Sequence, residues 1–251
     1  MKLFGRTKEQ GPITTASSQN QTRWDIQDDP DYWNEESRIV EDTCKASLPE
    51  VLANPMAGYQ PHEIKPDPNV FRILQAHEAM SDHSPVLEMG CGGGRMGLIW
   101  LSTCEQMEFR PPMFMTDHAP TSVAIAQARF RGIRPDPNDR FECVAGGDLA
   151  TKFDAESVGV VYTHTALQHN SKWKQDYILR ALWGVLKPRG YLYLWCEATF
   201  TSERRPEVVL WHSYSDDRGS AGTAAWWIAH ICWVGFELIE YADETYLFRK
   251  L

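Results

Sequence analysis

A short stretch, residues 84–97 (SPVLEMGCGGGRMG), combines an acidic side chain with an almost bare backbone. Glu88 lies near the end of an apolar run, and four of the five positions from 90 to 94 are glycine. Glycines that follow a strand let a ligand approach the backbone closely, and the next helix offers free N–H groups with partial positive charge. The stretch therefore predicts a ligand-binding loop between a strand and a helix.

Three kinds of ligand use such a loop, and the spacing of the residues separates them. A nucleoside triphosphate requires GxxxxGK[ST], which this sequence lacks. A dinucleotide requires GxGxxG; Gly90 and Gly92 fit the first two positions, but Arg95 takes the third, where its side chain obstructs helix–strand packing. The Glu88 carboxylate repels pyrophosphate and suits a ligand that carries an ammonium and a sulfonium group. That ligand is S-adenosylmethionine.

The same residues support a family resemblance. VLEMGCGGGR resembles the first motif, E/D-x-G-x-G-x-G, of the class I S-adenosylmethionine-dependent methyltransferases, with Glu88, Gly90, Gly92 and Gly94 on its defining positions. Three later stretches resemble further motifs in the family's order: MFMTDHA, CVAGGDLATKFDAESVGVVYTHTALQHN and VLKPRGYLYLW. The resemblance covers residues 84–197 and, in outline, 222–251. It implies a methyltransferase with S-adenosylmethionine as its cofactor.

The resemblance assigns cofactor contacts to side chains that end the second and third strands. Asp117 would accept hydrogen bonds from both ribose hydroxyls, although an acid here also suits capping of the helix that starts near Pro120. His118 would flank the adenine. Asp148 would accept a hydrogen bond from the adenine amino group while the Leu149 backbone meets the ring edge; an ordinary turn acid is the alternative.

Other candidates lie at the first helix and at the end of the fourth strand. Arg95 opposes the helix dipole, which indicates an anionic partner such as the methionine carboxylate; a solvated arginine is the alternative. Cys91 belongs to the binding loop, and Thr163 is expected beside the methionine portion. His164 or His169 would act as a general base or orient the acceptor; a histidine bonded to backbone beside the cofactor is the alternative. The HTALQH spacing predicts no metal site.

Two aromatic-rich segments are expected to build the pocket for the methyl acceptor. Methyl transfer depends mainly on in-line placement of the acceptor and exclusion of water, so its catalytic residues are weakly marked in a sequence. The segments contribute Trp24, Tyr32 and Trp33 before the core, and Trp211, His212 and Tyr214 in an insertion at about 198–222. Aromatic and acidic side chains together favour a cationic or aromatic small molecule, although Arg204 and Arg205 leave room for an anionic one.

The leading hypothesis is therefore methyl transfer to a nitrogen or oxygen of a small molecule. One alternative is methylation of a protein or RNA. The net charge of −9 argues against a large nucleic-acid footprint, and no NPPY- or DPPY-type motif follows the fourth strand. A second alternative is a non-catalytic module that binds the cofactor; the intact Glu88, Gly90, Gly92 and Asp117 argue against it. The acceptor's identity and the oligomeric state stay open.

Alternating apolar strands and helices are expected to position these residues. The expected strands are residues 85–90, 112–117, 141–146, 157–164, 191–197, 236–241 and 244–250, and the helices 94–104, 120–132, 171–187 and 223–235, with Gly235 expected to cap the C-terminus of the last. This order predicts an α/β fold with a doubly wound, mostly parallel, Rossmann-like sheet of about seven strands and an antiparallel C-terminal edge strand. In such sheets, ligands bind outside the carboxyl ends of the strands.

The remaining features concern domains and compartment. Residues 1–22 are predicted to be a mobile polar tail, 23–83 an N-terminal helical cap and 84–251 the methyltransferase core. The 251 residues, 43% of them hydrophobic, suffice for one sizeable core. Six cysteines without CxxC spacing indicate reduced thiols, and no signal peptide or membrane-span pattern occurs. A cytoplasmic location is therefore expected, with a small-molecule acceptor as the partner and no membrane contact.

Overall fold

The structure is a computed structural model of the 251-residue chain, and it describes residues 44–79, 84–167, 170, 172–195, 224–242 and 245–251. The predicted polar tail, the start of the predicted cap and the insertion at 198–222 lie outside the described residues.

A sheet of seven strands forms the centre of the molecule, in the order β3-β2-β1-β4-β5-β7-β6. The strands are β1 (Val86–Met89), β2 (Met113–Asp117), β3 (Arg140–Cys143), β4 (Val158–His164), β5 (Leu186–Trp195), β6 (Phe236–Ala242) and β7 (Thr245–Lys250). The first five pair in parallel, whereas β7 is antiparallel to both of its neighbours. The predicted fold class is confirmed.

The C-terminal hairpin differs in one detail from the expected edge. The antiparallel strand β7 lies one position inside the sheet, and β6 forms the edge. Tyr246, Leu247 and Phe248 of β7 are buried on alternating faces of the sheet, as expected for an interior strand with a helical layer on each face. Ile239 and Tyr241 of β6 are exposed, as an edge strand permits.

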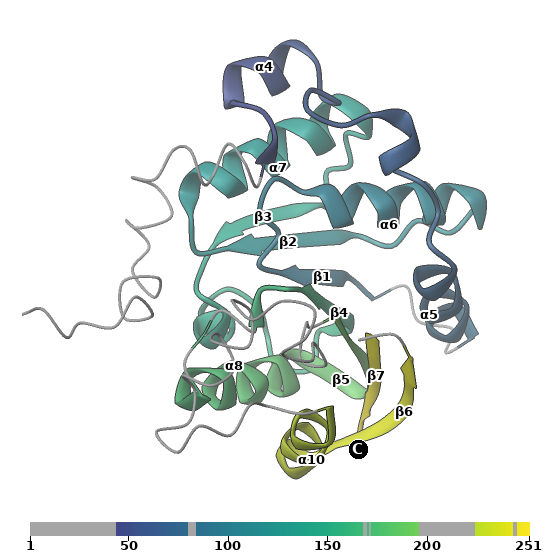
Figure 1. The fold of residues 1–251 in the computed structure, drawn as a ribbon, viewed down its shortest axis with the longest axis vertical. Helices are drawn as coiled ribbons and strands as arrows, with labels where there is room; N and C mark the ends of the chain where they lie inside the picture. The colour runs from purple at the N-terminus through teal and green to yellow at the C-terminus, as the bar shows by residue number, and fades with distance from the viewer. Residues whose placement is uncertain (1–43, 80–83, 168–169, 171, 196–223, 243–244) are drawn as a thin grey trace, which may run out of the picture.

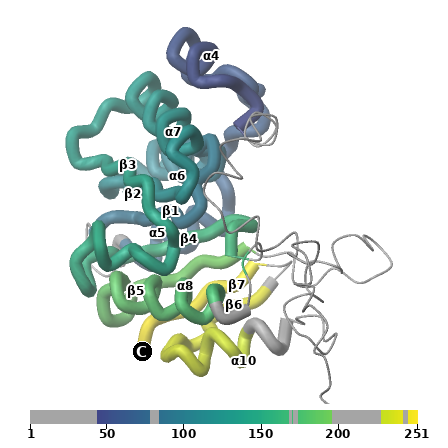
Figure 2. Tube along the Cα trace, turned by 90° about the vertical axis from the view of Figure 1, so that its left-hand side faces the viewer, coloured from purple at the N-terminus to yellow at the C-terminus, as the bar shows by residue number. Residues whose placement is uncertain are grey.

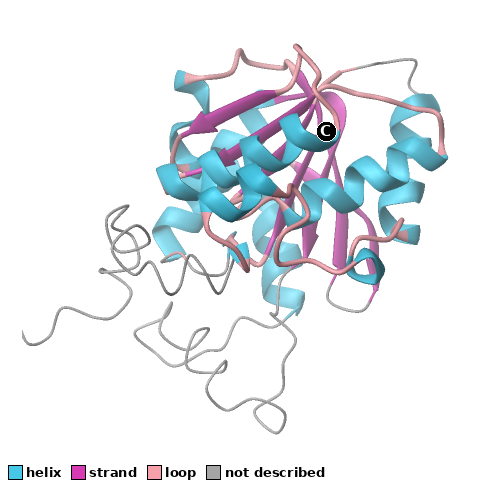
Figure 3. Ribbon diagram, turned by 90° about the horizontal axis from the view of Figure 1, so that it is seen from above, coloured by secondary structure: helices cyan, strands magenta, loops and turns pink. Residues whose placement is uncertain are grey.

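Helices cover both faces of this sheet (Figures 1, 2 and 3). The helices in the described residues are α4 (Leu48–Ala53), η2 (Pro61–Glu63), α5 (Pro68–Ala79), α6 (Arg95–Gln106), α7 (Pro120–Ile133), η3 (Gly146–Thr151), α8 (Lys172–Val185) and α10 (Ala224–Val234), and α4 packs on the outer side of α7. Apolar residues of α5, α6 and α7 pack on one face, and those of η3, α8 and α10 on the other. Because α5 packs directly on the sheet, part of the predicted N-terminal cap contributes to the helical layer.

Local sequence signals set several helix ends. Pro120 occupies the first turn of α7 as predicted, where its missing N–H costs no hydrogen bond. Gly235 follows α10 with φ of +118°, so the predicted C-terminal glycine is confirmed. The helix expected up to residue 187 ends at Val185, because Pro188 and Gly190 lie in a bulged start of β5.

A buried arginine fastens the N-terminal segment to α7. Arg129 is 0% exposed, and its guanidinium donates to the carbonyl oxygens of Cys44, Pro55 and Ala57, each at 2.8 Å. The same guanidinium lies 4.4 Å from the centre of the Tyr59 ring. Five donors in a planar fork suit several carbonyls at once, so Arg129 joins three points of this segment to one helix. The sequence analysis did not predict this contact.

Replacing Arg129 should therefore destabilise the fold. Arg129→Met keeps the side chain's length but leaves three buried carbonyls without this donor, which should lower the free energy of unfolding by about 2–4 kcal/mol. Urea denaturation followed by circular dichroism measures the change. The control is Arg131→Met, an exposed arginine on the same helix, which should stay within about 0.5 kcal/mol of wild type. Equal losses in the two variants would contradict the anchoring role.

Candidate cofactor and active site

The glycine loop lies between two other loops at the carboxyl ends of the strands. The N–H groups of Gly90 and Cys91 both donate to the carbonyl oxygen of Thr116 in β2, at 2.9 Å. Gly90 has φ of +76°, and a Cβ added there would lie 2.2 Å from the Cβ of Ala166, which follows β4. Gly94, with φ of +82°, is the N-cap of α6. Only glycine meets both the positive φ and the close approach at position 90.

Asp117 ties this loop to the next helix. One carboxylate oxygen accepts the Gly92 N–H at 2.9 Å, and the other accepts the Ala119 N–H, also at 2.9 Å, at the start of α7. His118 Nδ1 lies 3.5 Å from the second oxygen. Asp117 thus bonds to the N–H of Ala119, the N-cap residue of α7, and not to an N–H group inside that helix. Because each carboxylate oxygen has two acceptor sites, it leaves capacity for a ligand hydroxyl.

Glu88 occupies a different position from the one that the sequence argument gave it. Its side chain is 2% exposed and lies on the α6 face of the sheet, where Tyr162 Oη donates to it at 2.6 Å. The Gly97 N–H, in the first turn of α6, donates to it as well. Trp100 stacks on Tyr162, with ring centres 4.4 Å apart. Glu88 thus satisfies a helix N–H that would otherwise lack a partner in the core.

Burial also changes the charge of Glu88. It raises the pKa of the carboxyl to about 8, with Asp117 adding in the same direction, while the hydrogen bond from Tyr162 acts against the rise. The carboxyl is therefore mainly protonated at neutral pH. Glu88 therefore does not present a negative charge to a cationic ligand, contrary to the prediction from the sequence; the group is neutral and supports the loop from within the core.

Arg95, at the start of α6, lies close enough to His164, at the end of β4, for its charge to affect the imidazole. Arg95, the first residue of α6, is exposed and forms no ion pair with another described residue. Burial, together with the nearby Arg95 guanidinium, lowers the pKa of the His164 imidazole to about 4, whereas Asp67 acts in the opposite direction. His164 is therefore neutral at pH 7. An unperturbed histidine would titrate near 6.5, so its base strength is lower than the sequence suggested.

Trp195, which the sequence analysis did not single out, completes this part of the site. It is the residue opposite His164 in the pairing of β4 with β5, and the two rings stack with centres 4.1 Å apart and planes 9° apart. Both side chains are half-buried. The signal available in the sequence was an aromatic residue at the end of an apolar strand, but nothing there indicated its partner.

The turn after β4 is strained. Thr165 has φ of +58°, which is rare for a β-branched residue. Its N–H donates to the carbonyl oxygen of Trp195 at 2.9 Å, and its hydroxyl donates to that of His164 at 2.7 Å. Thr163 is fully buried and lies beside Leu194 in the sheet, so its side chain points to the α8 face, away from His164. Its hydroxyl has no hydrogen-bond partner among the described residues.

The loop after β3 approaches the same edge of the sheet. Asp148 lies in η3, is exposed and accepts a hydrogen bond from Tyr177 Oη at 3.1 Å. Leu149 is fully buried in the core on the α8 face. Cys143 Sγ lies 3.4 Å from the His118 carbonyl oxygen, which joins this loop to the end of β2. The other predicted site residues lie outside the described part of the chain: His169, Trp24, Tyr32, Trp33, Trp211, His212 and Tyr214.

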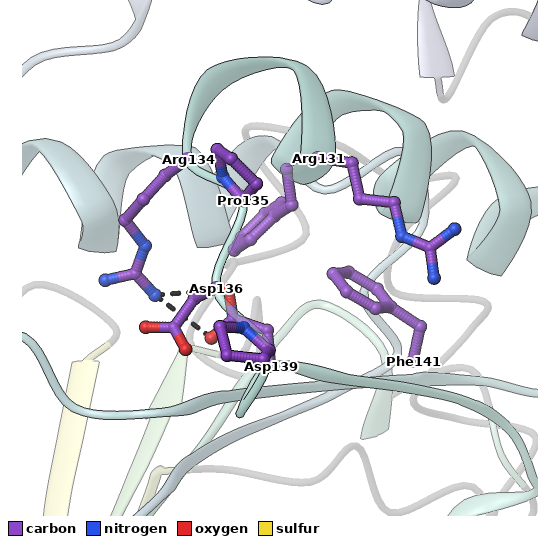
Figure 4. Close-up of a pocket in the computed structure, with 8 residues that line it drawn as sticks. Arg131, Arg134, Pro135, Asp136, Asp139 and Phe141 are labelled. Atoms are coloured by element: carbon purple, nitrogen blue, oxygen red, sulfur yellow. Dashed lines mark hydrogen bonds and ion pairs between the residues drawn. The ribbon is translucent and has the colours of Figure 1, made fainter.

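A separate pocket of about 450 Å³ opens at the opposite edge of the sheet, between α7 and β3 (Figure 4). Its wall includes Phe130, Phe141 and the buried ion pair of Arg134 with Asp139, at 3.0 Å. Asp139 also accepts the Met113 N–H at the start of β2, so this pocket lies at the amino ends of the strands. It does not join the glycine loop. Among the described residues, no group of three His, Cys, Asp or Glu side chains is arranged to hold a metal ion.

The strand order, the glycine loop and its link to the acid that ends β2 define the fold of a class I methyltransferase core. Residues 86–190 match the sequence family described as "Methyltransferase domain". This part of the chain is therefore similar to a methyltransferase domain, and its fold is that of such a domain. No curated protein sequence matches it well enough to count as a relative. Of the helices in the described ranges, none has the length and hydropathy that a membrane span needs.

Solved structures share this fold at low sequence identity. A DszA carbon methyltransferase superposes with a TM-score of 0.57 and 16% identity over 72% of this chain and 52% of its own. Magnesium protoporphyrin IX methyltransferase from Synechocystis PCC 6803, with bound SAM, superposes with a TM-score of 0.55 and 13% identity over 90% of this chain and 97% of its own. The [4+2]-cyclase SpnF superposes with a TM-score of 0.52 and 18% identity over 82% of this chain and 74% of its own. This chain spans about half the length of the first, and these likenesses concern the fold alone.

The buried Glu88 predicts a pH-dependent stability. The pKa of Glu88 rises from 4.5 to about 8 on folding. Its contribution to the free energy of unfolding is therefore fully present below pH 4.5 and is lost as the pH rises through 8. Glu88→Gln keeps the shape without the ionisation. The stability of wild type relative to this variant should fall between pH 5 and 9, by on the order of 3 kcal/mol.

Urea denaturation at several pH values measures this difference. Glu105→Gln, at an exposed position in α6, is the control for loss of a carboxylate from the same helix. A constant difference between wild type and Glu88→Gln across the range would show that Glu88 is charged in the folded protein.

A further prediction concerns His164. Its imidazole should remain neutral down to about pH 5, as followed by NMR through the ring C–H shifts. Arg95→Gln should move its pKa upward, because the guanidinium no longer opposes protonation. Arg110→Gln, at an exposed position beyond α6, should leave it unchanged. A His164 that titrates near 6.5 in the wild type would contradict the burial argument.

Proposed function

We propose that this protein is a methyltransferase that transfers the methyl group of S-adenosylmethionine to a nitrogen or oxygen of a small molecule. The observation that carries the proposal is the glycine loop, held by Asp117 at the carboxyl ends of β1 and β2 with Arg95 and His164 beside it. A cation-bearing cofactor and an acceptor are expected at this edge of a parallel sheet.

In this proposal the cofactor lies across the loop formed by Gly90, Cys91, Gly92 and Gly94. Arg95 binds the methionine carboxylate, since it has no ion-pair partner among the described residues and its fork matches a carboxylate. The remaining acceptor capacity of the Asp117 carboxylate takes the ribose hydroxyls.

The adenine lies between the ends of β2 and β3 in this arrangement. His118 flanks the ring, and the Asp148 carboxylate accepts from the amino group while the Leu149 backbone meets the ring edge. The hydrogen bond from Tyr177 to Asp148 holds the carboxylate in place. Thr163, whose side chain points to the α8 face, contributes to this site through its backbone.

The acceptor lies beyond His164. The lone pair of the acceptor's nitrogen or oxygen attacks the methyl carbon in line with the carbon–sulfur bond. The electron pair of that bond returns to sulfur and leaves a neutral thioether. Because the His164 pKa is about 4, the neutral ring suits accepting a hydrogen bond from the acceptor better than storing a proton at pH 7. His169, with Tyr32, Trp33, Trp211, His212 and Tyr214, remains a proposed contributor to catalysis or to the acceptor pocket.

The acidic net charge favours a small molecule over RNA as the acceptor. A cytoplasmic location fits the free cysteines, which include five of the described residues: Cys44, Cys91, Cys104, Cys143 and Cys232. The alternative of a protein acceptor, or of a module that binds the cofactor without transfer, is distinguished by experiment. SpnF, a cyclase, has a related fold, so the fold by itself does not decide between these activities.

Cofactor binding is the first test. Calorimetry should show S-adenosylmethionine and S-adenosylhomocysteine binding in the micromolar range, about −8 kcal/mol, and no binding of NAD. Asp117→Asn should weaken both by about 10- to 150-fold, or roughly 1.5–3 kcal/mol, because one backbone N–H and the ribose lose their acceptor. Asp136→Asn, in the distant loop before β3, is the matched control and should bind as wild type.

Transfer itself is tested with labelled S-adenosylmethionine and metabolite extracts. Label that enters small molecules and is lost with Asp117→Asn supports the proposal. Label found only in protein or RNA fractions would redirect it to a macromolecule, and NAD binding without S-adenosylmethionine binding would overturn it.

A further inference from the structure

The stacked rings of His164 and Trp195 form an aromatic surface at the edge where the methyl group must leave. Both residues end their strands, at the paired carboxyl ends of β4 and β5. Two residues after His164, Ala166 lies against Gly90, so this surface adjoins the glycine loop. The hydrogen bond from Thr165 N–H to the Trp195 carbonyl oxygen fixes the two strand ends relative to each other. The stack is therefore built into the fold and does not rest on flexible side chains alone.

Carboxyl groups near this surface are engaged elsewhere. Asp67, the acid that acts on His164, accepts the N–H groups of Asn69 and Val70 at 2.7 and 3.3 Å at the start of α5. Glu88 is buried and holds Tyr162 and α6. Asp117 accepts two backbone N–H groups at the other side of the loop. Among the described residues, a positive charge at the end of β4 therefore meets aromatic faces first.

The charge of His164 matters for this role. A protonated imidazole would repel a neighbouring cation, whereas a neutral imidazole stacked on an indole presents polarisable faces. Burial and the Arg95 guanidinium both oppose protonation of this ring. Aromatic faces attract cations, most strongly at an indole, and the attraction grows as water is excluded.

We propose that the stack of His164 on Trp195 contacts the sulfonium centre of the cofactor, with the His164 ring on the side of the glycine loop and the indole behind it, and so selects the methylated over the demethylated form. This inference rests on the function proposed above. Before transfer the sulfur is positive and is attracted by the stacked aromatic rings, to whose electron density the indole contributes most. After transfer the electron pair of the broken carbon–sulfur bond leaves a neutral thioether, and the attraction is lost. Trp195 is thus a specificity-determining residue that favours binding of substrate and release of product.

The test is the ratio of two affinities in each variant. Calorimetry measures Kd for S-adenosylmethionine and S-adenosylhomocysteine, which differ in the methyl group and its charge. Trp195→Leu should weaken binding of S-adenosylmethionine by about 3- to 30-fold, while the Kd for S-adenosylhomocysteine should change by less than about 2-fold. Trp195→Phe, which keeps an aromatic face, should lie between the wild type and the leucine variant. Sinefungin, which carries an ammonium in place of the sulfonium, should follow S-adenosylmethionine.

Controls separate the possible failures. Trp183→Leu removes a tryptophan of α8 that packs on Gly235 and should leave the ratio unchanged. If Trp195→Leu does not fold by circular dichroism, Trp195→Met fills the space without a ring and should shift the ratio in the same direction. Equal weakening of both ligands would overturn the inference, because Trp195 would then serve packing alone. A wild type that binds neither ligand would instead overturn the proposed function.

Discussion

The candidate site depends on one carboxylate that is shared between two backbone segments. Asp117 accepts the N–H of Gly92 with one oxygen and the N–H of Ala119 with the other, so the glycine loop and the start of α7 are held at a fixed separation. A loop rich in glycine has high conformational entropy when free, and such tethers offset the cost of ordering it. The close contact between Gly90 and Ala166 holds the loop from the other side.

Burial decides the charge of the groups beneath and beside this loop. Glu88 and His164 are both expected to be ordinary titrating side chains from their types, yet burial raises the pKa of the first and lowers that of the second, so both are neutral at pH 7. Arg129 remains charged in the core because three carbonyls and the Tyr59 ring compensate it. The site therefore has few free charges among its described residues, and Arg95 and Asp148 are the exposed ones.

This distribution suits a ligand that carries its own charges. In the proposed arrangement, a carboxylate binds Arg95 at the start of α6, whereas a sulfonium contacts the stacked rings of His164 and Trp195. The strained backbone at Thr165 lies at the junction between these two regions, and its hydrogen bonds to Trp195 and His164 hold the stack in place. Strain of this kind persists where the surrounding structure fixes it, and it is frequent at functional sites.

The sequence by itself determined the order of strands and helices, the binding loop and the acid that ends β2, because these depend on local periodicity and on glycine spacing. It also placed Pro120 and Gly235 at helix ends for reasons of backbone geometry. Only the tertiary structure decided that Glu88 faces α6 and is neutral, and that Trp195 stacks on His164. A strand's alternation tells which residues share a face, but the partners and burial on that face come from elements distant in the chain.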